Sequence, residues 1–136
     1  MVNLVINGLH VSVERGTTLL EAAKFLGFPI PTLCHIDGLS PYGACRLCVV
    51  EIGEDSNAKL VSSCTYPAEE GLKVRTASSR VLRARKMILE LLLASCPQSK
   101  IIQDLASAHG IRRQRFKQEH DDCILCGLCV RMCEEQ

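Results

Sequence analysis

Clustered cysteines constrain this chain more than any other feature of its sequence. The chain holds nine cysteines in 136 residues, and eight of them fall into two groups of four. The upstream group has the spacing C-x10-C-x2-C-x15-C and consists of Cys34, Cys45, Cys48 and Cys64. The downstream group has the spacing C-x2-C-x2-C-x3-C and consists of Cys123, Cys126, Cys129 and Cys133. Grouped thiolates are soft ligands that select zinc, copper(I) or iron-sulfur centres, so the sequence predicts metal-containing sites.

Structural disulfides are not expected for these cysteines. The first ten residues, MVNLVINGLH, lack the basic and apolar segments of a signal peptide, and no later stretch approaches the roughly 18 apolar residues of a membrane span. We therefore expect a cytoplasmic protein without direct membrane insertion, whose thiols stay reduced. The balance of 16 Lys and Arg against 15 Asp and Glu gives a net charge of +1, so no bulk field attracts nucleic acid.

Local patterns predict an α+β domain in the first part of the chain. Two short alternating apolar runs flank Asn7-Gly8, the strongest short-range hairpin signal. A helix follows, with Thr17 or Thr18 as its N-cap and Glu21 in the position that a capping box requires. Further strand-like segments, rich in β-branched residues, lie at residues 48–52, 59–64 and 72–76.

The pattern becomes helical from about Ser79. A long helix with one mostly apolar stripe is expected to end before Pro97, and a shorter one is expected over residues 100–110. Basic residues on the other side of the long helix are expected to form a solvated face, and these are Arg80, Arg83 and Lys86.

The upstream cysteine spacing suits a 2Fe-2S centre, in which two irons each take two thiolates. Cys45 and Cys48 form a close pair on one loop, and one further thiolate arrives from each side along the chain. Gly43, a small residue beside them, would let backbone N–H groups approach the sulfides. Four cysteines around one C-x2-C also suit zinc, although zinc ribbons usually contain two such pairs. Spacing alone favours 2Fe-2S and leaves zinc open.

Residues 6–52, INGLHVSVERGTTLLEAAKFLGFPIPTLCHIDGLSPYGACRLCVVEI, resemble the amino-terminal domain of the large iron-sulfur subunit of respiratory complex I and the diaphorase small subunit of NAD-linked hydrogenases. The resemblance extends over essentially the whole chain. That family begins with a β-grasp, 2Fe-2S ferredoxin-like domain. The resemblance therefore implies such a domain over residues 1–78, with its 2Fe-2S ligands at Cys34, Cys45, Cys48 and Cys64.

The middle of the chain departs from that family. The family carries a His-x3-Cys-x2-Cys-x5-Cys site for a 4Fe-4S cluster after the long helix, whereas residues 79–118 here offer only Cys96, with His109 in the wrong order. We therefore expect a helical connector without that cluster. Cys96 is expected to be a small buried apolar residue. His35 is expected to contribute to loop packing.

Residues 119–136 resemble the start of a 4Fe-4S ferredoxin-like domain. In two-cluster ferredoxins the first three cysteines of this motif bind one cluster and the fourth binds the other. Cys123, Cys126 and Cys129 are thus expected 4Fe-4S ligands, whereas Cys133 points to a cluster whose other ligands are absent from the sequence. Three interpretations stay open: the chain is truncated or split, Cys133 completes one cluster, or a partner supplies a ligand. Truncation or splitting is favoured.

The resemblance implies an electron-transfer subunit or fragment. It would relay single electrons between a flavin- and NADH-binding partner and a second redox module, such as a hydrogenase, a formate dehydrogenase or a quinone-linked module. No dinucleotide or triphosphate motif and no nucleophile-base pair is recognisable, so we expect no catalytic residues. The competing interpretation is a zinc-stabilised, non-redox interaction module. A thiol redox sensor that uses Cys45 and Cys48 ranks third.

Overall fold

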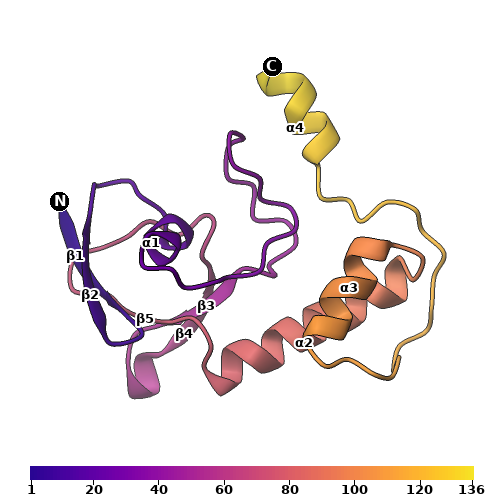
Figure 1. The fold of residues 1–136 in the computed structure, drawn as a ribbon, viewed down its shortest axis with the longest axis horizontal. Coiled ribbons are helices and arrows are strands. Elements are labelled where there is room, and N and C mark those ends of the chain that lie inside the picture. Colours follow the sequence, from indigo (N-terminus) through magenta and orange to yellow (C-terminus); the bar gives the residue numbers. More distant parts are fainter.

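The chain begins with the expected β-hairpin in the computed structural model, which describes residues 1–136 (Figure 1). The hairpin consists of the antiparallel strands β1 (Val2–Ile6) and β2 (Leu9–Val13). Asn7 and Gly8 connect them and both adopt positive φ, 51° and 83°. A two-residue type I′ turn requires positive φ at both central positions, so the Asn-Gly prediction is confirmed.

A five-stranded mixed sheet forms around this hairpin, with the strand order β2-β1-β5-β3-β4. The other strands are β3 (Val49–Ile52), β4 (Lys59–Ser62) and β5 (Lys73–Arg75), and a short 3-10 turn, η1 (Asp55–Asn57), connects β3 to β4. β5 runs parallel to β1, and every other neighbouring pair is antiparallel. The predicted α+β class is therefore confirmed, and the arrangement is consistent with a 2Fe-2S ferredoxin-like fold.

Helix α1 (Leu19–Phe25) packs on the sheet (Figure 1). Thr18 is its N-cap: the Thr18 hydroxyl accepts a hydrogen bond from the Glu21 amide, and the Glu21 carboxylate accepts one from the Thr18 amide at 2.8 Å. Leu19 enters the main core against the strands, whereas Leu20 packs on Cys48 and Cys64. One short helix thus joins the sheet core to the cysteine loops.

Helix α2 (Ser79–Ser95) begins at the Ser78 N-cap and packs against both β3 and α3 (Lys100–Ala108). Arg83 and Lys86 are exposed, as expected for a solvated face. Arg80 is exposed as well, and its guanidinium also forms a 2.9 Å ion pair with Glu51, a carboxylate on β3 that is only 3% exposed. A buried carboxylate needs a cation, so this basic residue is held by the sheet.

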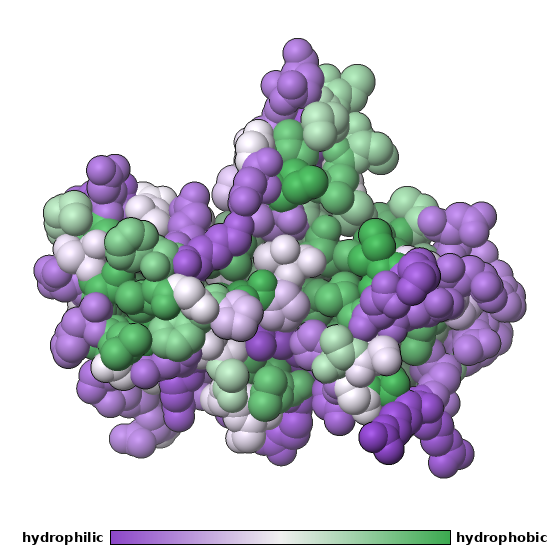
Figure 2. All heavy atoms as spheres, viewed as in Figure 1, coloured by the Kyte–Doolittle hydropathy of each residue, from purple (hydrophilic) through white to green (hydrophobic).

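The C-terminal part of the chain leads from α3 toward the loop that follows α1 (Figure 1). Its extended segment follows the end of α2, where the Glu119 amide donates to the Ala94 carbonyl at 2.7 Å. Helix α4 (Leu128–Glu135) then ends the described chain. Figure 2 shows hydrophobic surface on part of this projecting helix, and Val130 and Met132 are among its exposed side chains. Within residues 1–136, no helix combines the length and apolarity that crossing a bilayer needs.

Candidate metal centre

The β3-β4 register brings two of the upstream cysteines together. Cys48 immediately precedes β3, and Cys64 lies two residues after β4. The strands are antiparallel with Val49 opposite Ser62, so the two cysteines emerge at the same end of the sheet. Cys64 also lies within electrostatic range of Cys34 and Cys45, which come from the loop after α1. All four upstream cysteines therefore share one region, and three of them are at most 2% exposed: Cys34, Cys48 and Cys64.

Cys34 and Cys45 form the first thiol pair. The Cys45 amide donates to the Cys34 sulfur at 3.4 Å, and the Cys34 amide donates to the Cys45 sulfur at 3.5 Å. The Leu47 amide donates to the Cys45 sulfur at 3.5 Å as well. Burial raises the pKa of the Cys45 thiol, and these amide hydrogen bonds oppose that effect. Such donors favour a thiolate and support sulfur as a metal ligand.

Cys48 and Cys64 form the second thiol pair. The hydrogen bond between the two thiols lowers the pKa of Cys48 and raises the pKa of Cys64. A bound metal would supply the positive charge that keeps both as thiolates, because metal coordination deprotonates thiols.

Two residues with positive φ shape the loop that carries Cys34, Cys45 and Cys48. Gly43 has a φ of 72° and Arg46 a φ of 65°. A Cβ atom on Gly43 would approach the methyl group of Thr65 to 3.0 Å, so the turn requires glycine. The amides that reach sulfur belong to Cys34, Cys45 and Leu47, and Gly43 serves the turn and its contact with Thr65.

The four cysteine sulfurs of the upstream group fit a soft metal centre. Within residues 1–136, no three His, Cys, Asp or Glu side chains converge on a point that one metal ion could occupy. The upstream sulfurs instead lie in the two pairs described above. All nine cysteines are free thiols, so no disulfide competes for them.

The downstream cysteines are more open to solvent. Cys126 is half-buried, and the other three are exposed: Cys123, Cys129 and Cys133. The Leu125 amide donates to the Cys123 sulfur at 3.4 Å, which is a contact within the motif itself. The structure thus places these residues on one segment and does not gather their four sulfurs around one point.

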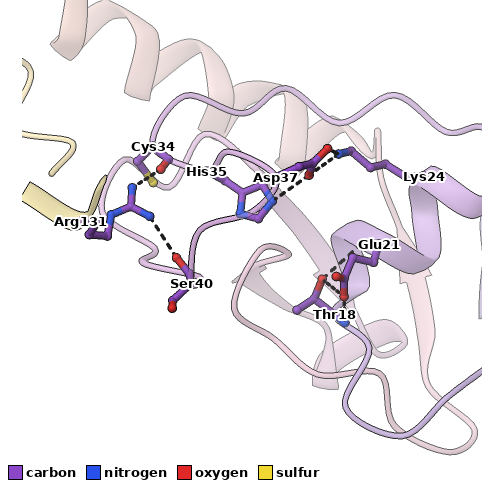
Figure 3. A network of polar contacts seen from close by, with 8 residues as sticks. All are labelled: Thr18, Glu21, Lys24, Cys34, His35, Asp37, Ser40 and Arg131. Atoms are coloured by element: carbon purple, nitrogen blue, oxygen red, sulfur yellow. Dashed lines mark hydrogen bonds and ion pairs between the residues drawn. The ribbon is translucent and has the colours of Figure 1, made fainter. Parts of the chain in front are cut away.

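Arg131 was not identified from the sequence, yet it joins the downstream motif to the upstream loop (Figure 3). It lies on α4, is 7% exposed, and donates to the carbonyl oxygens of Cys34 and, at 3.0 Å, Ser40. Its guanidinium carbon lies 4.6 Å from the centre of the Tyr42 ring, a cation-π contact. The Ser40 amide in turn donates to Glu135 at 3.0 Å. Helix α4 is therefore anchored on the loop that carries Cys34.

His35 directly follows Cys34 on this loop, and its side chain is only 13% exposed, in agreement with the expected packing role (Figure 3). Its Nε2 atom is 3.5 Å from an Asp37 carboxylate oxygen. Lys24 forms a 2.9 Å ion pair with the same carboxylate, and that lysine lowers the pKa of Asp37. The loop is thus tied to α1 by polar contacts.

Cys96 is 1% exposed at the end of α2, so its predicted burial is confirmed. Burial raises the pKa of its thiol, which disfavours the thiolate that a metal ligand needs. We expect Cys96→Ala to leave the iron content and the electron paramagnetic resonance (EPR) signals unchanged and to cost about 1 kcal/mol of stability. Iron analysis and denaturant unfolding of the variant check this. A fall in iron content would show that Cys96 is a ligand.

The part of the chain that contains the upstream cysteines matches a known protein family. Residues 1–79 match the family described as "2Fe-2S iron-sulfur cluster binding domain". The chain is 34% identical over 161 residues to the NADPH-Fe(3+) oxidoreductase subunit alpha of Geobacter sulfurreducens, covering 99% of this chain and 19% of the relative. It is 34% identical over 160 residues to the NADH-ubiquinone oxidoreductase 75 kDa subunit of Reclinomonas americana, covering 99% of this chain and 23% of the relative.

A solved structure resembles nearly the whole chain. A chain of the crystal structure of NAD+-reducing [NiFe]-hydrogenase in the H2-reduced state superposes with a TM-score of 0.83 at 33% sequence identity. The match covers 98% of this chain and 67% of the hydrogenase chain. Against the curated relatives named above, this chain spans only about a fifth of their length.

Proposed function

Since the chain belongs to the family of 2Fe-2S iron-sulfur cluster binding domains, we propose that it holds a 2Fe-2S cluster on Cys34, Cys45, Cys48 and Cys64 and serves as a single-electron relay. The observation that carries this proposal is the arrangement of the upstream sulfurs in two pairs. Each iron of such a cluster takes two protein thiolates. Cys34 and Cys45 would hold one iron, and Cys48 and Cys64 the other.

The residues around the two pairs prepare the site for an anionic centre. Amides of the loop donate to the Cys34 and Cys45 sulfurs, and Leu20 excludes water from Cys48 and Cys64. When bound, the cluster accepts and releases one electron at a time. The polypeptide orients the sulfurs, limits water access and leaves Cys45 as the most exposed of the four ligands. An electron would therefore enter or leave the cluster on the side of Cys45.

The partners proposed here follow from the relatives' names. Those names describe subunits of oxidoreductases that use NADH, NADPH or NAD+. A nicotinamide transfers a hydride, whereas an iron-sulfur centre takes one electron, so a flavin has to stand between them. We propose a flavin- and NADH-binding subunit on one side, and on the other a hydrogenase, formate dehydrogenase or quinone-linked module. The free thiols accord with a reducing compartment such as the cytoplasm.

The remaining parts of the chain receive separate proposals. We divide it into a β-grasp domain at residues 1–78, a helical connector at 79–118 and a 4Fe-4S ferredoxin-like segment at 119–136. In the last segment Cys123, Cys126 and Cys129 would bind a 4Fe-4S cluster, and Cys133 would serve that cluster or another one. Their exposure suits a site that is completed by further ligands.

Iron and acid-labile sulfide per chain test the proposal most directly. Anaerobically purified protein is expected to contain about two irons and two sulfides if only the upstream group is filled, and about six of each if both are filled. A 2Fe-2S EPR signal should appear on chemical reduction. Colourless protein that contains zinc and no sulfide would contradict the proposal and establish the zinc-stabilised interaction module instead.

A further inference from the structure

Two arginine side chains are buried beside the upstream cysteines. Arg85 on α2 is 3% exposed, and its Nη2 atom donates to the carbonyl oxygens of Val49 at 2.9 Å and Thr76 at 2.8 Å. Arg131 on α4 is 7% exposed and donates to the Cys34 carbonyl oxygen. Val49 directly follows Cys48 in the sequence, so one guanidinium lies next to each thiol pair.

Neither buried arginine has an anionic partner within ion-pair distance. Three more exposed guanidinium groups do have one: Arg75 and Arg80 pair with Glu51, and Arg115 pairs with Glu90. The Glu135 carboxylate interacts electrostatically with Arg131 over a longer distance than an ion pair. Glu135 is exposed, however, and accepts a hydrogen bond from the Ser40 amide. The Nε atoms of Arg85 and Arg131 are also buried and have no hydrogen-bond partner. Burying a guanidinium without an anion is strongly unfavourable.

A thiolate-bound iron-sulfur centre would supply the missing negative charge. Four thiolates and two sulfides carry more negative charge than two ferric ions carry positive, so the oxidised centre is already anionic. Reduction adds one electron from a reduced partner or a chemical reductant, and the centre becomes one unit more negative without needing a proton. Nearby fixed positive charges stabilise the reduced form more than the oxidised form.

We propose that Arg85 and Arg131 are the counter-charges of the upstream centre and that they raise its reduction potential. This inference rests on the proposed 2Fe-2S function. Arg85 acts from the side of Cys48, and Arg131 acts from the side of Cys34. Because Arg131 belongs to the downstream cysteine motif, docking of α4 makes the potential of the upstream centre depend on the C-terminal segment.

EPR-monitored redox titration of the 2Fe-2S signal tests this inference in the full chain. Arg85→Gln and Arg131→Gln are each expected to lower the equilibrium constant for reduction about tenfold, because a unit charge acts over a short distance in a partly desolvated site. Tenfold for a one-electron couple corresponds to about 59 mV. In the double variant the equilibrium constant should fall about a hundredfold, since the two groups contact different carbonyl oxygens and their effects should add.

Conservative and remote variants separate charge from packing. Arg85→Lys and Arg131→Lys keep the charge but lose the planar fork that donates to two carbonyl oxygens, so their equilibrium constants should fall clearly less than those of the glutamine variants. Arg83→Gln on α2 and Arg113→Gln remove equal charges from exposed positions, and their equilibrium constants should stay within about threefold of the parent, because solvent screens these charges.

Three results would overturn the inference. The first is an unchanged potential in both glutamine variants that retain the EPR signal. The second is a lysine variant whose potential shifts as far as that of its glutamine counterpart, since geometry and not charge would then be responsible. If a glutamine variant fails to assemble the centre, the reduction potentials of the lysine variant at that site and of the variants at the other site test the effect of the charge. The third is a parent protein without iron or sulfide, which would remove the proposed function along with this inference.

Discussion

Cys48→Ser is expected to abolish or strongly alter the 2Fe-2S EPR signal and to remove about two irons per chain. Cys48 is 2% exposed and lies against Cys64, so the substitution leaves one iron with a single soft thiolate ligand. Metal binding and folding are linked, so the loop around residues 43–48 should lose order together with the iron. Iron analysis, visible absorbance and EPR of the reduced protein measure the effect.

The matched comparison for Cys48→Ser is Cys96→Ala, a change at a cysteine that is equally buried but lies outside the two pairs. That variant should keep its colour. Full iron content and an unaltered signal in Cys48→Ser would show that Cys48 is not a ligand and that the two-pair assignment is wrong.

Leu20→Ala is expected to destabilise the protein by about 2–5 kcal/mol and to shorten the lifetime of the cluster in air. Leu20 has no exposed surface, and its side chain packs directly on Cys48 and Cys64. Truncation leaves a cavity beside sulfur, where water and oxygen gain access. Denaturant unfolding measures the first effect, and the rate of loss of visible absorbance in air measures the second.

Leu19→Ala is the matched control for Leu20→Ala. Leu19 is the neighbouring residue on α1, is 1% exposed and packs in the sheet core, away from the thiols. The two variants should be destabilised similarly, but only Leu20→Ala should bleach markedly faster. Equal bleaching rates would mean that global unfolding limits cluster loss and that Leu20 has no specific shielding role.

Much of the fold could be predicted from local sequence patterns. Asn7-Gly8 predicted the hairpin because few other dipeptides adopt positive φ at both positions. Glu21 placed three residues after Thr18 predicted the start of α1, because a capping box depends only on that spacing. The long helix α2 and its end before Pro97 followed from apolar periodicity and from the missing N–H of proline.

Long-range features were harder to predict. The ion pair of Arg80 could not be predicted, because helical periodicity does not reveal that Glu51, 29 residues earlier, lies opposite it. Arg131 gave no signal either, because its neighbours Val130 and Met132 are exposed and the polar residue is the buried one. A guanidinium can be buried wherever carbonyl oxygens and an aromatic ring happen to surround it, and that depends on tertiary packing.

The sequence by itself determined which residues can bind metal and which local elements carry them. Turn and cap signals act within a few residues of the chain, and cysteine spacing can be read from the chain without knowledge of its fold. Only the tertiary structure decided how the sulfurs are grouped, because the β3-β4 register joins Cys48 to Cys64 and the loop after α1 joins Cys34 to Cys45. It also decided that α4 places Arg131 on the Cys34 loop, 97 residues away, a contact that depends on the path of the whole intervening chain.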